Sequence, residues 1–140
     1  MYLLDSNVVS ELRSAARCDD RVRNWESGVS SGQCWISVLT LLEIRRGICQ
    51  VSARDALFAA ALECWLEGQV IPTFGGRVLP VSAAVADRAG RIAAMRTRGL
   101  ADCLIAATAL EHQLKLVTRN IADFDDVEGL AVLNPWEPQP

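Results

Sequence analysis

Short apolar runs alternate along the chain with longer segments in which apolar residues recur every three or four positions. Runs of the first kind predict strands, and segments of the second kind predict helices. The expected strands are YLL (2–4), CWIS (34–37), the end of GGRVLPV (75–81), KLVT (115–118) and a short strand near LAVLN (130–134). Helices that connect successive strands form right-handed crossovers, so this order predicts an α/β fold. We expect a mostly parallel sheet of four or five strands with helices on both faces.

Polar residues at the helix ends support this order. Ser37 is expected to cap the helix that carries Glu43, Ser82 to cap a helix that runs to about residue 98, and Gly99 to end it. A further helix is expected over residues 101–112. The helix 54–68 has one apolar stripe, which predicts a core face or a partner surface. This stripe consists of Leu57, Ala61, Leu62 and Trp65.

The chain of 140 residues has the size of one ordinary domain. We expect that domain to cover residues 1–136 and residues 137–140, EPQP, to form a frayed tail. No basic leader followed by an apolar stretch opens the sequence, and Glu63 and Asp102 interrupt its apolar runs. These features predict a soluble, unexported, cytoplasmic protein with no membrane association.

Five cysteines are present, with no CxxC pair and with one histidine, His112, in the whole chain. This number and spacing are typical neither of a disulfide framework nor of a zinc site. Cys34 and Cys103 lie in apolar runs and are predicted to be small core residues.

The net charge of −3 and the pI near 5.1 do not favour a nucleic-acid-binding protein, which usually has a basic face. The charges are segregated, however. Residues 88–98 contain four arginines and no acid, whereas five acids and no base follow Arg119. This distribution predicts a local basic lip beside an acidic pocket.

Carboxylates are the candidate chemical groups, because no glycine-rich phosphate loop, HExxH motif or GxSxG motif is present. Asp5 follows the first strand, and Glu43 lies in the helix after the second. Asp102 begins the helix over 101–112, and Asp123 follows the strand KLVT. Since the carboxyl ends of parallel strands meet at one edge of a sheet, we expect these four acids to converge there in one pocket.

Each acid also has a simpler explanation. Asp5 and Asp102 are typical helix caps, and Asp123 is typical of a turn. Glu43 is typical of a solvated helix face or of an ion pair with Arg46. Only the four acids taken together favour a functional site.

Oxygen and amide side chains surround the four acids in the sequence, and magnesium prefers oxygen ligands. These neighbours are Ser6, Asn7, Thr40, Thr118 and Asn120. Four carboxylates in one pocket would repel one another, and a divalent ion would relieve that repulsion. One or two ions, about 3.5–4 Å apart if there are two, could activate a water for in-line phosphoryl displacement. The pattern therefore predicts a metal site that contains Asp5.

Four segments in this order resemble the PIN-domain ribonucleases, and specifically the FitB-like branch of the VapC-type toxins of bacterial type II toxin–antitoxin pairs. The segments are LLDSNVVSELR (3–13), ISVLTLLEIRRG (36–47), LADCLIAATALEHQLKLVTRNIADF (100–124) and NPW (134–136). The resemblance runs from Met1 to about Trp136. It implies a PIN fold and a magnesium- or manganese-dependent endoribonuclease that cuts single-stranded regions of structured RNA.

The resemblance assigns roles to individual residues. Asp5 and Asp102 match the positions usually named as metal ligands. Glu43 matches the glutamate of the TxxE element, and Asp123 matches the acid of TRNxxDF, which completes the quartet through water. The family's supporting polar shell corresponds in this sequence to Asn7, Thr40, Thr118 and Asn120.

Two positions depart from the family pattern. Ser6 stands where threonine is common, which preserves the hydroxyl. The connection RTRGLAD (96–102) is shorter than usual, which would alter the rim of the cleft or the choice of RNA.

The resemblance also implies a cognate antitoxin protein and a homodimer formed through helices, for which Leu57, Ala61 and Trp65 offer an apolar stripe. Two other functions stay open. One is a PIN nuclease for RNA maturation or DNA processing outside a toxin–antitoxin setting, and the other is a catalytically silent binding module of the same fold.

Overall fold

Five parallel strands form one sheet in the computed structural model, which describes residues 1–139. The strands are β1 (Tyr2–Leu4), β2 (Cys34–Ser37), β3 (Val78–Leu79), β4 (Lys115–Val117) and β5 (Val132–Leu133), and their order is β3-β2-β1-β4-β5. All five expected strands are present, and the predicted α/β fold with a parallel sheet is confirmed. The chain adds strands on one side of β1 first and then continues with β4 on its other side, so the topological switch lies between β1 and β4.

Helices cover both faces of the sheet, as expected. One face carries α1 (Ser6–Glu11), α2 (Asp20–Ser27), α3 (Val38–Ser52), α4 (Ala56–Trp65), the π-helical turn η2 (Leu66–Val70) and α5 (Ile71–Phe74). The opposite face carries α6 (Ala83–Ala93) and α7 (Leu100–Glu111). Two 3₁₀ turns, η1 (Ser31–Gln33) and η3 (Ile121–Asp123), lie in the connections.

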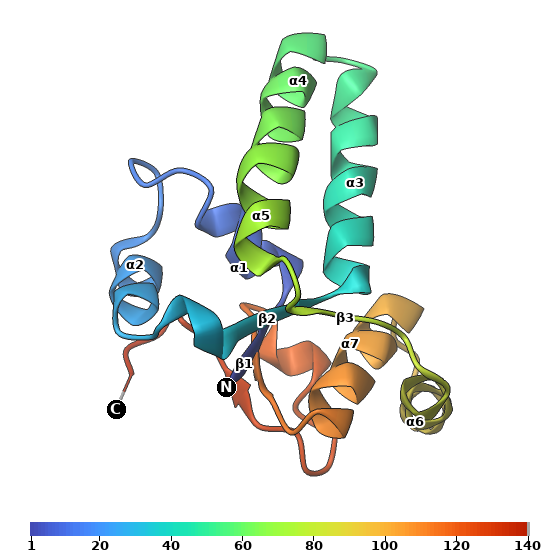
Figure 1. Cartoon of the computed structure of the whole chain (residues 1–140). Helices are drawn as coiled ribbons and strands as arrows, with labels where there is room; N and C mark the ends of the chain where they lie inside the picture. Colours follow the sequence, from blue (N-terminus) through green and yellow to red (C-terminus); the bar gives the residue numbers. More distant parts are fainter. Residues whose placement is uncertain (140) are drawn as a thin grey trace.

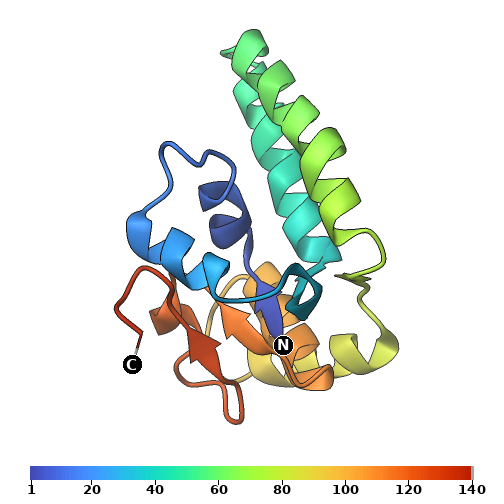
Figure 2. The ribbon, with the colours of Figure 1, turned by 60° about the vertical axis from the view of Figure 1, so that its left-hand side comes forward.

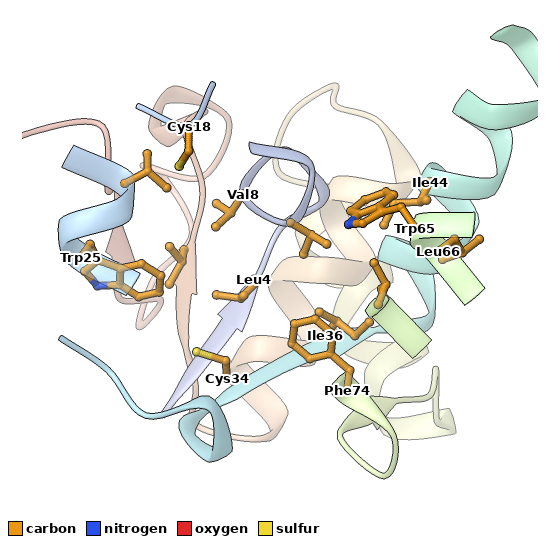
Figure 3. Close-up of a cluster of buried hydrophobic side chains, with 14 of the residues drawn as sticks. Leu4, Val8, Cys18, Trp25, Cys34, Ile36, Ile44, Trp65, Leu66 and Phe74 are labelled. Atoms are coloured by element: carbon orange, nitrogen blue, oxygen red, sulfur yellow. The ribbon is translucent and has the colours of Figure 1, made fainter. Parts of the chain in front are cut away.

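Alternating side chains along β1 divide the core into two clusters. Leu4 packs with Ile36 on the face of α1 to α5, whereas Leu3 packs with Leu116 on the face of α6 and α7. Figure 3 shows the first cluster, where side chains from the sheet meet Val8 of α1 and residues of α3 to α5. Because both faces of the sheet are buried, its strands read as continuous apolar runs rather than alternating ones.

Helices α3 and α4 form a hairpin that extends away from the sheet in both views (Figures 1 and 2). Arg45 of α3 holds the two helices together by donating to both carboxylate oxygens of Glu63. Only part of the predicted apolar stripe is on the surface. Leu57 is 86% exposed, but Trp65 is 9% exposed and belongs to the core. For Trp65 the core alternative of the prediction is therefore confirmed and the dimer-surface role is not, because the chain packs the base of the hairpin onto its own sheet.

The connection between α6 and α7 differs from the expectation. Helix α6 begins at the predicted cap, since the Ser82 hydroxyl accepts from the amide of Val85, but it ends at Ala93 rather than near residue 98. Gly99 is the N-cap of α7 and does not end α6. The intervening residues leave the helix because their side chains make long-range contacts with the segment 122–126.

The predicted basic lip is wrong, because every arginine of residues 88–98 forms an ion pair. Two pairs involve α6: Arg88 with Glu111 at 2.7 Å, and Arg91 with Asp87 at 3.1 Å. Arg96 and Arg98 both pair with Asp126, at 3.6 and 2.7 Å. Only the last two arginines of the basic segment thus pair with the acidic segment that follows Arg119.

The cysteine predictions for the core are confirmed: Cys34 is 7% exposed and Cys103 is 1% exposed. All five cysteines are free thiols. Within residues 1–139, no helix has the length and apolar character that crossing a bilayer requires. The predicted tail at 137–140 lies partly outside the described residues.

Candidate active site at the carboxyl edge of the sheet

Asp5 lies directly after β1 and is only 5% exposed. Its Oδ1 accepts from the amide of Ser6 at 2.8 Å, which caps α1, and its Oδ2 accepts from the hydroxyl of Thr118 at 2.8 Å. The side-chain nitrogen Nδ2 of Asn7 donates to the same Oδ2 at 3.4 Å. Asp5 is therefore both a helix cap, the simpler explanation, and a buried carboxylate fixed by several donors. A carboxylate offers about four lone pairs, so Oδ1 keeps capacity for a further ligand.

Thr118 and Asn7 support Asp5 from opposite ends of the chain. Thr118 is fully buried at the end of β4, and its hydroxyl also accepts from the amide of Asn120 at 3.1 Å. Asn7 donates to the Thr118 hydroxyl at 3.2 Å and accepts from the backbone amide of Arg119 at 3.3 Å. Three of the predicted shell residues thus form one network across the switch point between β1 and β4.

Glu43 lies in α3, one turn after Thr40. The Ser37 hydroxyl accepts from the amides of Leu39 and Thr40 and confirms the predicted cap of this helix. The Thr40 hydroxyl, 1% exposed, donates to the carbonyl of Leu4 at 3.3 Å, so it fixes the start of α3 against the end of β1. Within residues 1–139, Glu43 Oε1 is buried without a hydrogen-bond partner, and no ion pair joins Glu43 to Arg46. A buried, unpartnered carboxylate oxygen is costly unless it binds something.

Asp102 occupies the first turn of α7, and Gly99 is the N-cap of that helix. The interpretation of Asp102 as a helix cap is therefore wrong, which leaves its carboxylate available. Asp123 is the last residue of η3, in the connection that follows β4. Both side chains are partly buried at the carboxyl edge of the sheet.

Three of the four acids line one cavity of about 350 Å³ between α1 and the base of the α3–α4 hairpin. Asp5, Glu43 and Asp102 are the acids of its wall, together with the predicted polar neighbours Ser6, Asn7 and Asn120. Its far wall is apolar, and sequence reasoning did not identify this part. That wall includes Ile44, Ile48, Val51, Leu62 and Trp65. Asp123 is not part of this lining.

The charge of Asp123 nevertheless acts on two of the other acids, Asp5 and Asp102. Burial raises the pKa of Asp5 above its ordinary value of 3.8, and hydrogen bonds from Thr118 and Ser6 oppose this rise. Burial likewise raises the pKa of Glu43, and the charges of Asp5 and Asp102 raise it further. The pKa of Asp102 is raised by burial and then by the charges of Asp123 and Asp5. Asp5, Asp102 and Asp123 therefore act on one another through their charges, and Glu43 is affected by Asp5 and Asp102. The expectation that Asp123 shares one pocket with the other three acids is not met, because it does not line the cavity.

This donor set fits a hard divalent cation in its chemistry. It combines oxygen ligands, mutual repulsion and an unpartnered buried oxygen on Glu43. In the part of the chain that the structure describes, no three of these side chains approach closely enough to surround one ion as they stand. An ion would thus be held by one or two direct carboxylates, with waters completing its shell, as magnesium commonly is.

Comparison with known proteins decides the family. The sequence profile of the PIN domain matches residues 2–130. The chain belongs to the PIN-domain family. A VapC ribonuclease, Y4jK of Sinorhizobium fredii, is 37% identical over 99% of each chain. Toxin FitB of Neisseria gonorrhoeae is 34% identical over 97% of this PIN domain and 99% of its own length.

Solved structures give the same result. The crystal structure of FitAcB from Neisseria gonorrhoeae contains a chain that superimposes with a TM-score of 0.87 at 32% identity, covering 99% of this chain and 100% of that one. A DNA-bound VapBC from Salmonella typhimurium superimposes with a TM-score of 0.76 at 22% identity, covering 96% and 97% of the two chains, which shows a shared fold. The similarity to VapC-type toxins inferred from the motifs is thereby confirmed.

Besides the apolar wall, two further features of the site escaped sequence reasoning. Ser10 lines the cavity one helical turn after Ser6, a spacing that could have indicated it. The contacts of Arg96 and Arg98 with the segment around Asp123 could not have been found, since they join loops 25 or more residues apart.

Proposed function

We propose that this protein is a metal-dependent endoribonuclease and the toxin of a toxin–antitoxin pair. The observation that carries the proposal is the convergence of Asp5, Glu43 and Asp102 on one cavity, with Asp123 in Coulombic range. The named relatives support the same function, since one is a VapC ribonuclease and another is a toxin. A catalytically silent module would have no use for four mutually repelling acids.

Asp5 and Asp102 would hold the ion directly, the unpartnered Oε1 of Glu43 would be available as a further oxygen donor, and Asp123 would act through water. A bound magnesium or manganese ion supplies Lewis-acid stabilisation and an activated water. The chain itself supplies rigidity. Thr118 and Ser6 fix both oxygens of Asp5, so the carboxylate is preorganised and needs no rearrangement when the ion and the scissile phosphate bind.

Two arginines offer phosphate contacts despite the acidic balance of the chain. Arg119 follows Thr118, and its guanidinium lies over the ring of Trp136, 5.1 Å from the centroid. Arg13, just after α1, lies over Phe58 of α4 at 5.4 Å. Neither forms an ion pair within residues 1–139, and the aromatic rings restrict their motion. We assign them to the backbone of single-stranded RNA, which a planar guanidinium can bind through paired hydrogen bonds.

The proposed partner is a small antitoxin, in line with the toxin–antitoxin complexes among the structural neighbours. A pocket that attracts a divalent cation also attracts a guanidinium. We propose that the antitoxin lays an apolar helix on this protein while one of its arginines approaches Asp5, Glu43 and Asp102. That arginine would hinder metal binding and exclude RNA at the same time.

The test is induced expression in a bacterial host, followed by mapping of new RNA ends, with and without the product of the adjacent gene. We expect new ends at defined sites and growth arrest, and we expect co-expression of the neighbour to suppress both. New ends that the neighbour does not suppress would indicate a PIN nuclease outside a toxin–antitoxin setting. An absence of new RNA ends would contradict the ribonuclease assignment.

A further inference from the structure

Two arginines in the short connection between α6 and α7 donate to successive backbone carbonyls at the end of η3. Arg96 Nη2 donates to the carbonyl of Ala122 at 2.8 Å, and Arg98 Nη1 donates to the carbonyl of Asp123 at 2.8 Å. The last carbonyls of a helical turn have no partner within the turn, so side-chain donors there fix where it ends. We call Arg96 and Arg98 the arginine clamp.

Asp126 anchors the arginine clamp on its other side. Arg98 Nη2 lies 2.7 Å from Asp126 Oδ2, and Arg96 Nε lies 3.6 Å from the same oxygen. The side chain of Arg98 is 3% exposed. Each other arginine that forms an ion pair within residues 1–139 keeps 39% or more of its side chain exposed. Arg98 is thus held in the interior, whereas the rest are surface pairs of small energetic value.

The Arg98–Asp126 pair is poorly designed for stability alone. Among the described residues, Arg98 Nε and Asp126 Oδ1 are buried without hydrogen-bond partners. Burying a guanidinium is expensive, and replacing such a pair with apolar residues is often neutral or stabilising. The pair instead fixes positions, because the planar guanidinium of Arg98 binds the carboxylate of Asp126 and the carbonyl of Asp123 at the same time.

The clamp connects two of the four acids of the site. Arg98 precedes Asp102 by four residues, at the start of α7, and it binds the carbonyl of Asp123 itself. The charge of Asp123 raises the pKa of Asp102, so the two carboxylates repel each other, and the nearby charge of Arg98 lowers the pKa of Asp102 and offsets part of that repulsion. The hydrogen bond from Arg98 to the backbone of Asp123 adds a fixed attachment that charge alone does not supply.

We propose that Arg98, assisted by Arg96, is a positioning residue that holds Asp123 beside Asp102. The proposal rests on the proposed metal-dependent cleavage for its kinetic consequence, but its structural consequence is independent of any activity. The clamp lies within the short connection between the two helices, since residues 94–99 join α6 to α7 and both arginines of this segment reach across to η3.

The test compares Arg98→Met with Arg88→Met. Arg88 forms an ion pair of the same length, 2.7 Å, but with Glu111 at the other end of α7, so it is a matched control. Amide hydrogen–deuterium exchange measures the loop directly, without activity. We expect faster exchange confined to the peptide covering residues 118–126 in Arg98→Met and no such change in Arg88→Met.

Cleavage kinetics measure the consequence for the site. Residues that orient metal ligands typically affect metal affinity or activity by about 10- to 100-fold. We expect Arg98→Met to raise the manganese concentration for half-maximal cleavage by about that factor with little change in the KM for RNA. Arg98→Lys keeps the charge but lacks the fork, so it should stay impaired. Should Arg98→Met fail to fold, Asp126→Asn removes the anchor and takes its place in both measurements.

Unchanged exchange over residues 118–126 in folded Arg98→Met, or wild-type metal dependence in that variant, would overturn the proposal. Full activity of Arg98→Lys would also overturn it, since charge alone would then suffice. A wild-type protein that cleaves no RNA, combined with loosened exchange in Arg98→Met, would instead remove the proposed function and leave the clamp in place.

Discussion

The hydroxyl of Thr118 donates a 2.8 Å hydrogen bond to the carboxylate of Asp5, which lies 113 residues earlier in the chain. Both residues follow central strands that are direct neighbours in the sheet, β4 and β1. The bond spans the topological switch point, where open α/β sheets bind their ligands. The candidate site therefore lies at the carboxyl ends of β1 and β4, where the crossover connections lead away in opposite directions.

Replacing Thr118 with valine tests the importance of this bond. Valine fills the same volume but donates nothing, so the buried Asp5 carboxylate loses its shortest side-chain donor. We expect the free energy of unfolding to fall by about 1–3 kcal/mol. We also expect cleavage to fall by about 10- to 100-fold. Chemical denaturation and initial rates measure these effects, and Thr118→Ser, which keeps the hydroxyl, should retain most of the activity. Wild-type activity in Thr118→Val would contradict a positioning role for Thr118.

Divalent ions should stabilise the fold, because the acids converge only in the native state. An ion at about ten times its Kd stabilises by about 1.4 kcal/mol. In a domain of this size that corresponds to an increase in melting temperature of about 3–5 °C. Thermal denaturation with manganese should show this increase in the wild type and a smaller one in Asp102→Asn. An equal increase in both proteins would show that the ion binds elsewhere.

The metal-free protein should lose stability as the pH rises through the acidic range. Burial raises the pKa of Asp5, Glu43 and Asp102 in the folded state, so between the unfolded and folded pKa values the native state binds more protons than the unfolded state. Stability contributed by these groups is then greatest at low pH and declines above their ordinary values of 3.8 and 4.5. Asp102→Asn should show a shallower decline in melting temperature over this range than the wild type. A steeper decline in the variant would contradict a raised pKa of Asp102 in the folded state.

The strands and the placement of Asp5, Glu43 and Asp102 at one edge of the sheet could be predicted because both depend on local patterns, whereas Asp123 does not line the cavity that it was expected to share. Apolar runs such as Tyr2–Leu4 identify buried strands, and each acid follows such a run or lies in the helix after it. The end of α6 and the pairing of Arg98 with Asp126 could not be predicted, because long-range contacts override the local helical pattern there. The division of the apolar stripe into buried Trp65 and exposed Leu57 could not be predicted for a related reason: a stripe of one helix does not reveal which of its turns lies over the sheet.

The exposed part of the hairpin should mediate a homodimer. Leu57 is 86% exposed and Leu42 is 56% exposed, on the two helices that extend away from the sheet. We expect a dimer by light scattering at micromolar concentration. We expect Leu57→Asp to be monomeric but still folded, with cooperative thermal unfolding. The control is Val81→Asp, an exposed apolar residue outside the hairpin, 39% exposed, which should remain dimeric. A monomeric wild type would refute the prediction.

Cleavage of a single-stranded RNA by purified wild type and Asp102→Asn, across a titration of manganese, tests directly whether these carboxylates form a catalytic metal site. An amide has nearly the shape of the carboxylate but lacks its charge, so the variant should stay folded and lose the metal-dependent activity. We expect wild-type cleavage that rises with manganese and stops on chelation, with Asp102→Asn inactive at every concentration. Full, chelator-sensitive cleavage by Asp102→Asn would contradict the assignment of the site.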